Sequence, residues 1–186
     1  MADLPLLLEP EQLADLLPLD NVLIIDQSKA ETFMEGHIPG AVHLDFKRLQ
    51  RPGTPVPGLL PEMSELETVF SELGLTAETH VICSDDEGGG WAGRLIWVLD
   101  CIGHTKYSYV NGGIVAWRQE GLPEESGEVT PRSSDYKITA INENATFTKA
   151  QVLDNLGKPD FAIWDARSAA ELSLIHISEP TRLEPI

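Results

Sequence analysis

The chain has 186 residues, of which 42% are hydrophobic, and it carries a net charge of −17 at pH 7. This hydrophobic content is sufficient for a packed core and excludes a disordered chain, while the length allows one complete domain and part of a second. The acidity argues against nucleic acid as a partner, and the lack of an apolar run of about 18 residues argues against a membrane span. The presence of only two cysteines and the absence of a basic leader sequence favour the cytoplasm.

Short apolar runs alternate with helical patterns along the first two thirds of the chain, which is typical of an α/β domain. We expect a central, mostly parallel sheet of about five strands with helices on both faces. Ser28 and Glu31 have the spacing of a capping box at a helix start. The predicted strands are 22–25, 41–44, 80–83 and 107–110, and the predicted helices lie near residues 13–17, 28–35, 62–73, 91–101 and 113–117.

The last third of the chain partly repeats the beginning. Residues 121–146 are polar and contain proline, so we expect a linker. After it, Thr148 and Gln151 form a second candidate capping box, and an apolar run at 161–164 is predicted to be a strand ending at an aspartate. Residues 22–26 show the same pattern about one domain length earlier, which indicates domain duplication.

Three segments carry a specific signal. Residues 36–43 read Gly-His-Ile-Pro-Gly-Ala-Val-His, residues 110–117 read Val-Asn-Gly-Gly-Ile-Val-Ala-Trp, and residues 85–94 contain three acidic residues followed by three glycines. Together they resemble the rhodanese family of sulfurtransferases, and the resemblance covers about residues 20–120. It implies a rhodanese-like fold, no cofactor and no metal. It also implies that a group of signature residues is structural: Gly36, His37, Pro39, Gly40, Gly112 and Gly113.

Rhodanese-type catalysis uses a cysteine in a loop that leads from a strand into a helix. Backbone N–H groups lower the thiol pKa there and hold a persulfide. By family register, Asp85 occupies this nucleophile position, and a carboxylate cannot carry a persulfide. The resemblance therefore implies that residues 1–120 form a non-catalytic copy without a catalytic residue, in a parent that passes sulfur from thiosulfate or 3-mercaptopyruvate to a thiophilic acceptor. Its partners would be small sulfur-containing anions.

Three residues are candidates for facing a cleft between two domains. Trp91 and Arg94 follow the acidic loop, and their alternative roles are helix packing and a surface ion pair. Residues 147–171 resemble the start of a catalytic-type second domain, since Asp165-Ala166-Arg167-Ser168 matches an Asp-x-Arg segment. Arg167 could neutralise a substrate there or simply pair with Asp165.

The family pattern stops after Glu171. Residues 172–186 resemble the translation of a sequencing adapter, so we hypothesise a non-native tail that truncates the second domain, with an ordinary divergent tail as the alternative.

Two other functions compete with the half-enzyme interpretation. A rhodanese fold without its cysteine could be a non-enzymatic binding or regulatory module. Alternatively, Cys83 could serve a single-domain enzyme, although it lies within a predicted strand, where a thiol is usually inert. Cys101 is predicted to be a small core residue. A phosphatase would need an arginine at position 89, where the chain has glycine, and a phosphate loop would need Gly-Lys-Ser/Thr after the glycines.

Overall fold

The computed structural model describes residues 4–18, 20–53 and 58–174 of the chain. These residues form two compact units, Met1–Thr146 and Phe147–Ile186, and each is considered by itself. The predicted tail at 172–186 lies almost entirely outside the described residues. No helix in the described part is long and apolar enough to cross a membrane.

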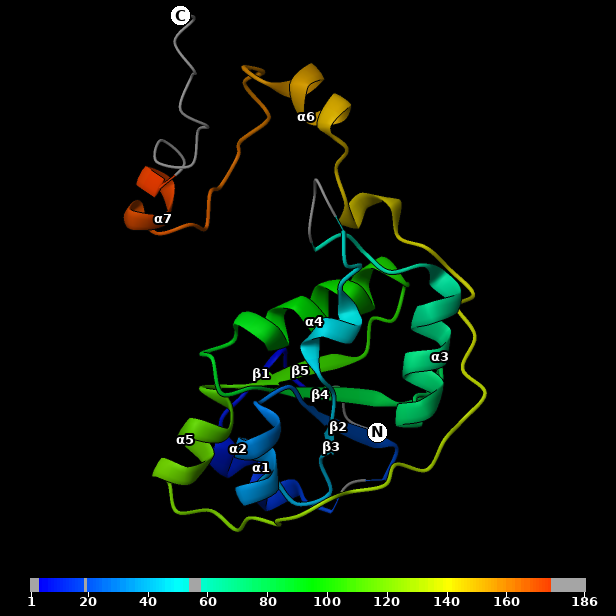
Figure 1. Cartoon of the computed structure of the whole chain (residues 1–186), viewed down its shortest axis with the longest axis vertical. Helices are drawn as coiled ribbons and strands as arrows, with labels where there is room; N and C mark the ends of the chain where they lie inside the picture. The colour runs from blue at the N-terminus through cyan, green and yellow to red at the C-terminus, as the bar shows by residue number, and fades with distance from the viewer. Residues whose placement is uncertain (1–3, 19, 54–57, 175–186) are drawn as a thin grey trace, which may run out of the picture. The chain divides into compact units, whose positions relative to one another are not determined.

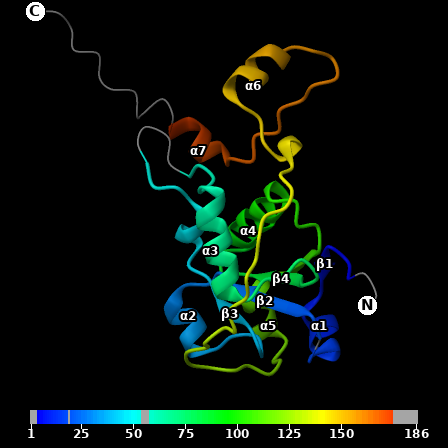
Figure 2. The same cartoon turned by 90° about the vertical axis from the view of Figure 1, so that its right-hand side faces the viewer.

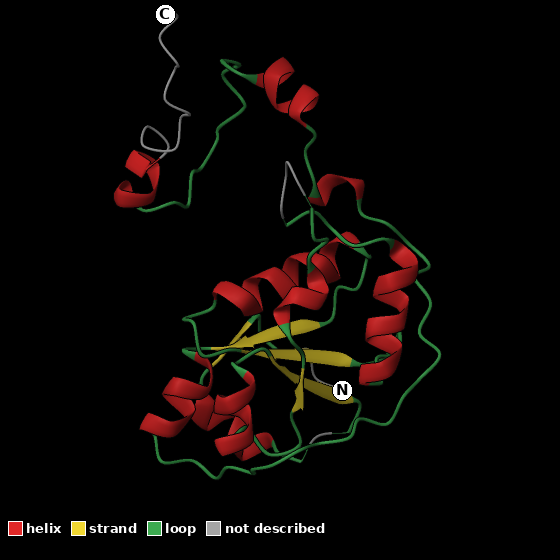
Figure 3. Ribbon diagram, in the orientation of Figure 1, coloured by secondary structure: helices red, strands yellow, loops and turns green. Residues whose placement is uncertain are grey.

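The first unit is built on a five-stranded sheet in which every neighbouring pair of strands is parallel (Figures 1 and 3). The strand order is β1-β5-β4-β2-β3. Because all strands are parallel, their carboxyl ends meet at one edge of the sheet. The central strands are continuous apolar runs, as expected for a sheet that is covered on both faces. The strands are β1 (Leu7–Leu8), β2 (Val22–Asp26), β3 (Val42–His43), β4 (His80–Ser84) and β5 (Tyr107–Val110).

Helices cover both faces of this sheet and divide the core into two clusters. On one face, α3 (Met63–Leu73) and α4 (Gly90–Cys101) bury one side of their surface, including Phe70 and Leu95. On the other face, α1 (Pro10–Leu16), α2 (Ala30–Glu35) and α5 (Gly113–Gln119) contribute residues such as Trp117. The predicted fold class is therefore confirmed.

Two local predictions differ from the structure. Strand β1 was not predicted, because only two residues pair, at the outer edge of the sheet. The capping box at Ser28 is wrong: α2 begins at Ala30 with Lys29 as its N-cap, and no side chain caps it. The reason is that the Ser28 N–H donates to the Asp26 carboxylate at 2.7 Å, which bends the chain before the helix starts.

The segment 121–146, predicted to be a linker, packs on the first unit over much of its length. Figure 2 shows it passing α3. The Ser134 N–H donates to the Ser71 carbonyl at 2.8 Å, the Tyr136 N–H donates to the Ser71 hydroxyl at 3.0 Å, and the Tyr136 ring is buried against Phe70 and His104. The compact unit therefore extends to Thr146, past a short 3₁₀ turn at Glu143–Ala145.

The second unit contains α6 (Lys149–Asn155) and α7 (Ala169–Leu174). Thr148 and Gln151 form the predicted capping box at the start of α6. The predicted strand at 161–164 is wrong, because these residues adopt no strand and pair with no described residue. Without a neighbouring strand the apolar run stays largely exposed: the Phe161 ring contacts the Phe147 ring with centroids 5.8 Å apart, but Trp164 is 93% exposed.

Candidate functional site

The acidic loop between β4 and α4 is wrapped around the side chain of Asp85. This carboxylate is fully buried and accepts four hydrogen bonds from backbone N–H groups. Oδ1 accepts from Glu87 at 3.2 Å and Gly89 at 2.9 Å, and Oδ2 accepts from Trp91 and Ala92, both at 2.9 Å. The last two donors belong to the first turn of α4, whose N-terminal dipole also favours a negative charge. The loop is therefore a built anion cradle.

Glycines give the loop this shape. Gly88 and Gly89 have φ angles of 67° and 95°, in the left-handed region that favours glycine. A Cβ on Gly89 would also lie 3.1 Å from the Tyr109 hydroxyl. Burial and the neighbouring Asp85 charge raise the pKa of Tyr109, so its hydroxyl stays neutral beside the loop. Local geometry thus explains Gly88 and Gly89, the first two glycines of the run.

The segment at residues 110–117 packs directly against the acidic loop. Gly113, with a φ of 57°, lies so close to Asp85 that any Cβ would overlap its carbonyl oxygen. That oxygen also accepts a hydrogen bond from the Ile114 N–H at 3.1 Å. The strand-to-helix turn after β5 and the acidic loop after β4 are therefore one interlocked structure, although 28 residues separate them in the sequence.

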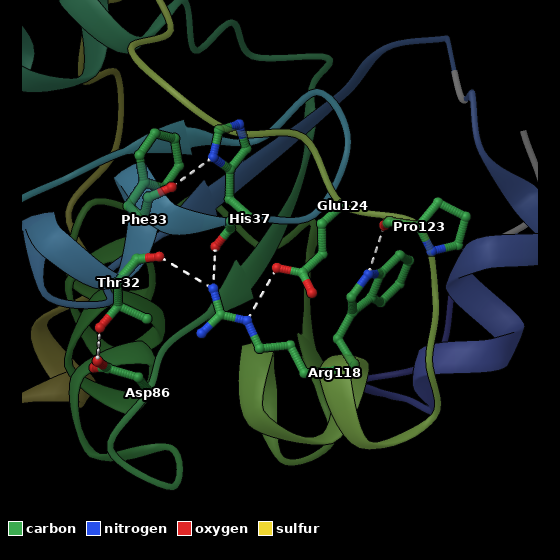
Figure 4. Close-up of polar contacts among 9 residues, drawn as sticks. Thr32, Phe33, His37, Asp86, Arg118, Pro123 and Glu124 are labelled. Carbon is green, nitrogen blue, oxygen red and sulfur yellow. Dashed lines mark hydrogen bonds and ion pairs between the residues drawn. The ribbon is translucent and has the colours of Figure 1, made fainter.

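Two further contacts join the acidic loop to α2. The Asp86 carboxylate accepts a hydrogen bond from the Thr32 hydroxyl at 2.8 Å (Figure 4). The Glu87 carboxylate pairs with Lys29 at 2.7 Å, and this ion pair raises the pKa of Lys29. Both partners of that pair are largely exposed, so it contributes little stability. The charge of Lys29 is thus paired with Glu87 of the acidic loop.

Trp91 and Arg94, the two predicted cleft residues of this unit, have different surroundings. Trp91 stacks on Phe46 with ring centroids 4.3 Å apart, and it lines a cavity of about 290 Å³ at the carboxyl ends of β2 and β3. Arg94 donates to the Leu49 carbonyl at 2.8 Å and lies over the Trp97 ring. Arg94 therefore holds the segment after β3 in place, while Trp91 borders an open space.

The first signature loop is a packing element. His37 is fully buried, stacks on Phe33 at 3.9 Å, and has its Nδ1 2.8 Å from the Phe33 carbonyl oxygen, to which it donates (Figure 4). Its backbone exchanges two hydrogen bonds with Glu125. Arg118 of α5 donates to the Thr32 and Gly36 carbonyls at 3.2 and 2.7 Å and pairs with Glu124 at 3.0 Å. The loop thereby ties α2, α5 and the segment after residue 120 together.

Both cysteines are buried in the first unit. Cys83 is fully buried within β4, and burial and the Asp85 charge raise its pKa far above the ordinary value. Cys101 is buried near the end of α4, where burial also raises its pKa. A thiol acts as a nucleophile in its ionised form, and burial disfavours that form at both positions.

A group of buried polar side chains beside the loop was not predicted. Gln27, Ser28 and Ser84 are almost completely buried at the carboxyl ends of β2 and β4, and their side-chain polar atoms have no hydrogen-bond partner in the described part of the structure. Burial raises the pKa of neighbouring Asp26. No sequence pattern distinguishes these residues from ordinary turn residues, since each follows an apolar strand.

In the second unit, Arg167 donates to the Asp165 carboxylate at 2.9 Å, and these contacts lower the pKa of Asp165 to about 2. Among the residues that the structure describes, no three His, Cys, Asp or Glu side chains are grouped to hold a metal ion.

Comparison with known proteins identifies a family and a set of relatives. The rhodanese-like domain matches residues 9–120. The thiosulfate sulfurtransferase of Pseudomonas aeruginosa is 42% identical over 170 residues, which are 91% of this chain and 62% of that protein. The 3-mercaptopyruvate sulfurtransferase of Escherichia coli K12 is 31% identical over 155 residues, 83% of this chain and 54% of that protein.

A solved structure agrees with these relatives. The crystal structure of SseA from Escherichia coli, a 3-mercaptopyruvate enzyme with the rhodanese fold, superposes with a TM-score of 0.81 at 28% identity, and the match covers 90% of this chain and 67% of that one. The chain spans less than two thirds of the length of the curated sulfurtransferases that it matches.

Proposed function

The chain belongs to the rhodanese family, and from this premise we propose that it is the non-catalytic first part of a two-domain sulfurtransferase. The parent would take sulfane sulfur from thiosulfate or 3-mercaptopyruvate and pass it to a thiophilic acceptor. Residues 147–171 would begin the catalytic domain. Both cysteines described here are free and buried, which agrees with a cytoplasmic protein.

The occupied cradle of Asp85 is the observation that supports this proposal. In the proposed reaction, a cysteine thiolate attacks the outer sulfur of thiosulfate, the S–S bond breaks, sulfite leaves with the electron pair, and an enzyme persulfide remains. An acceptor such as cyanide then takes the outer sulfur and restores the thiolate. A persulfide needs backbone N–H donors around its negative sulfur. Here all four donors already bind the carboxylate of Asp85, which has no sulfur to transfer.

The role left to this unit is structural support of a cleft. The carboxyl edge of the sheet carries the cavity bordered by Trp91, and ligands of open α/β sheets bind at this edge. Trp91 and Arg94, which follow the Asp85 loop, are the residues of this unit that we propose face the cleft.

Incubation of the chain with thiosulfate and cyanide tests the proposal. We expect no thiocyanate above the uncatalysed rate from the wild-type chain or from the matched variants Cys83→Ala and Cys101→Ala. Thiocyanate production that disappears in Cys83→Ala alone would instead support a single-domain enzyme. The complete reading frame is the second test: a cysteine loop about one domain further on is expected, and its absence would favour a binding or regulatory module.

A further inference from the structure

A second cavity lies at the opposite edge of the sheet from the acidic loop. Its volume is about 480 Å³, within the range of small-molecule sites. It is bordered by the end of α1, the first half of β2, the loop before β3, α5 and the segment after residue 120. The lining is mainly apolar: Ala14, Leu17, Pro18, Val22, Ile24, Pro39, Gly40, Trp117 and Pro123, with Glu125 as the one ionisable group among these residues.

The walls of this cavity are held firmly. The Trp117 ring is almost fully buried, and its indole N–H donates to the Pro123 carbonyl at 2.8 Å. The Gly40 N–H donates to Oε2 of Glu125 at 2.8 Å, and the Glu125 backbone is paired with His37. These bonds tie the Trp117 ring to Pro123 and place the Glu125 carboxylate beside Gly40 at the apolar wall.

Glu125 is exposed to solvent at the edge of this cavity, and no cationic side chain of the described residues pairs with it. Oε2 is bonded to Gly40, whereas Oε1 has no hydrogen bond or ion pair there. Arg118, seven residues before Glu125, is already bonded to Glu124 and to two carbonyl groups. A cation entering the cavity would meet the Glu125 carboxylate, which attracts positive charge, beside an otherwise apolar wall.

We propose that this cavity binds a small hydrophobic ammonium ion, with its apolar part between Leu17, Ile24 and Trp117 and its ammonium group on Glu125. The net charge of −17 adds a general attraction for cations. Anions such as the sulfur donors would be repelled. The site is independent of sulfur transfer, because the parallel strands place it at the amino edge of the sheet and the Asp85 loop at the carboxyl edge.

Titration of the whole chain with 2-phenylethylammonium, followed by ¹H–¹⁵N NMR, tests this site. We expect the Gly40 amide and Trp117 indole signals to shift, with a dissociation constant of about 1 mM. The isosteric neutral probe 2-phenylethanol should bind about fivefold more weakly, as expected when one partly exposed ion pair is lost. The anion 3-phenylpropanoate should cause no shift at these two signals.

Matched variants assign the effect to the cavity. Glu125→Gln keeps an acceptor for Gly40 and should weaken the ammonium probe about fivefold while leaving the alcohol unchanged. Glu128→Gln, an exposed glutamate of the same segment, is the control and should change neither. Ala14→Phe should fill the cavity and abolish both. Three results would each overturn the proposal. The first is equal affinity for the ammonium and the alcohol, and the second is binding that survives in a folded Ala14→Phe variant. The third is no signal shift at an ammonium concentration of roughly ten times the expected dissociation constant.

Discussion

Replacing Asp85 by asparagine perturbs the cradle with the smallest change in shape. The asparagine side chain retains one oxygen, so two of the four backbone N–H groups keep an acceptor and the other two face an NH₂ group. A hydrogen bond to a charged acceptor contributes about 1.5–3 kcal/mol. We take the lower value for each of the two lost bonds, because the outer residues of the loop are exposed to solvent. Their loss predicts a decrease of about 3 kcal/mol in the free energy of unfolding.

Urea unfolding followed by tryptophan fluorescence measures this effect. With a denaturant dependence of about 2 kcal/mol per molar, the midpoint should fall by about 1.5 M. Asp86→Asn is the matched control, since Asp86 accepts one hydroxyl group and two long backbone contacts at 3.4 Å, and it should cost less than about 1 kcal/mol. If Asp85→Asn and Asp86→Asn have the same midpoint, the carboxylate of Asp85 does not organise the loop.

Two further substitutions follow from the packing around the loop. Gly113→Ala should destabilise the chain by about 2–4 kcal/mol in the same urea assay, because the new Cβ would overlap the Asp85 carbonyl oxygen. The control Gly121→Ala has a similar φ of 67° but open space around the new Cβ, so it should cost about 1 kcal/mol. Equal costs of the two substitutions would contradict the close approach of Gly113 to Asp85. Burial keeps the Cys83 thiol protonated when the unfolded thiol ionises near pH 9, so stability should fall above that pH by up to about 1.4 kcal/mol per pH unit. Cys83→Ala should lose less stability than the wild type between pH 8 and pH 10, and an identical loss would show that another group is responsible.

The sequence was sufficient to predict the elements that carry continuous apolar runs. The runs within residues 22–26 and 80–84 pair as expected, because strands buried on both faces have this pattern. The same rule failed at 161–164, where the run is present but no neighbouring strand is described. A strand is stabilised by its neighbours, so an apolar run alone does not determine it.

The candidate site shows a similar division. Family register placed Asp85 at the nucleophile position, but its four backbone donors depend on the φ angles of Gly88 and Gly89, which a motif does not specify. The packing of Gly113 against Asp85 required knowledge of strand order, since β4 and β5 are neighbours only in the folded sheet. The packing of Tyr136 was missed because 121–146 has no apolar periodicity.

Mass spectrometry of the whole chain after incubation with thiosulfate, and separately with 3-mercaptopyruvate, tests the central claim most directly. Because Asp85 fills the cradle and both thiols are buried, the account predicts that the chain keeps its original mass, without a sulfur atom added to either cysteine. A persulfide on Cys83 that forms in the folded chain and is removed by cyanide would contradict the account.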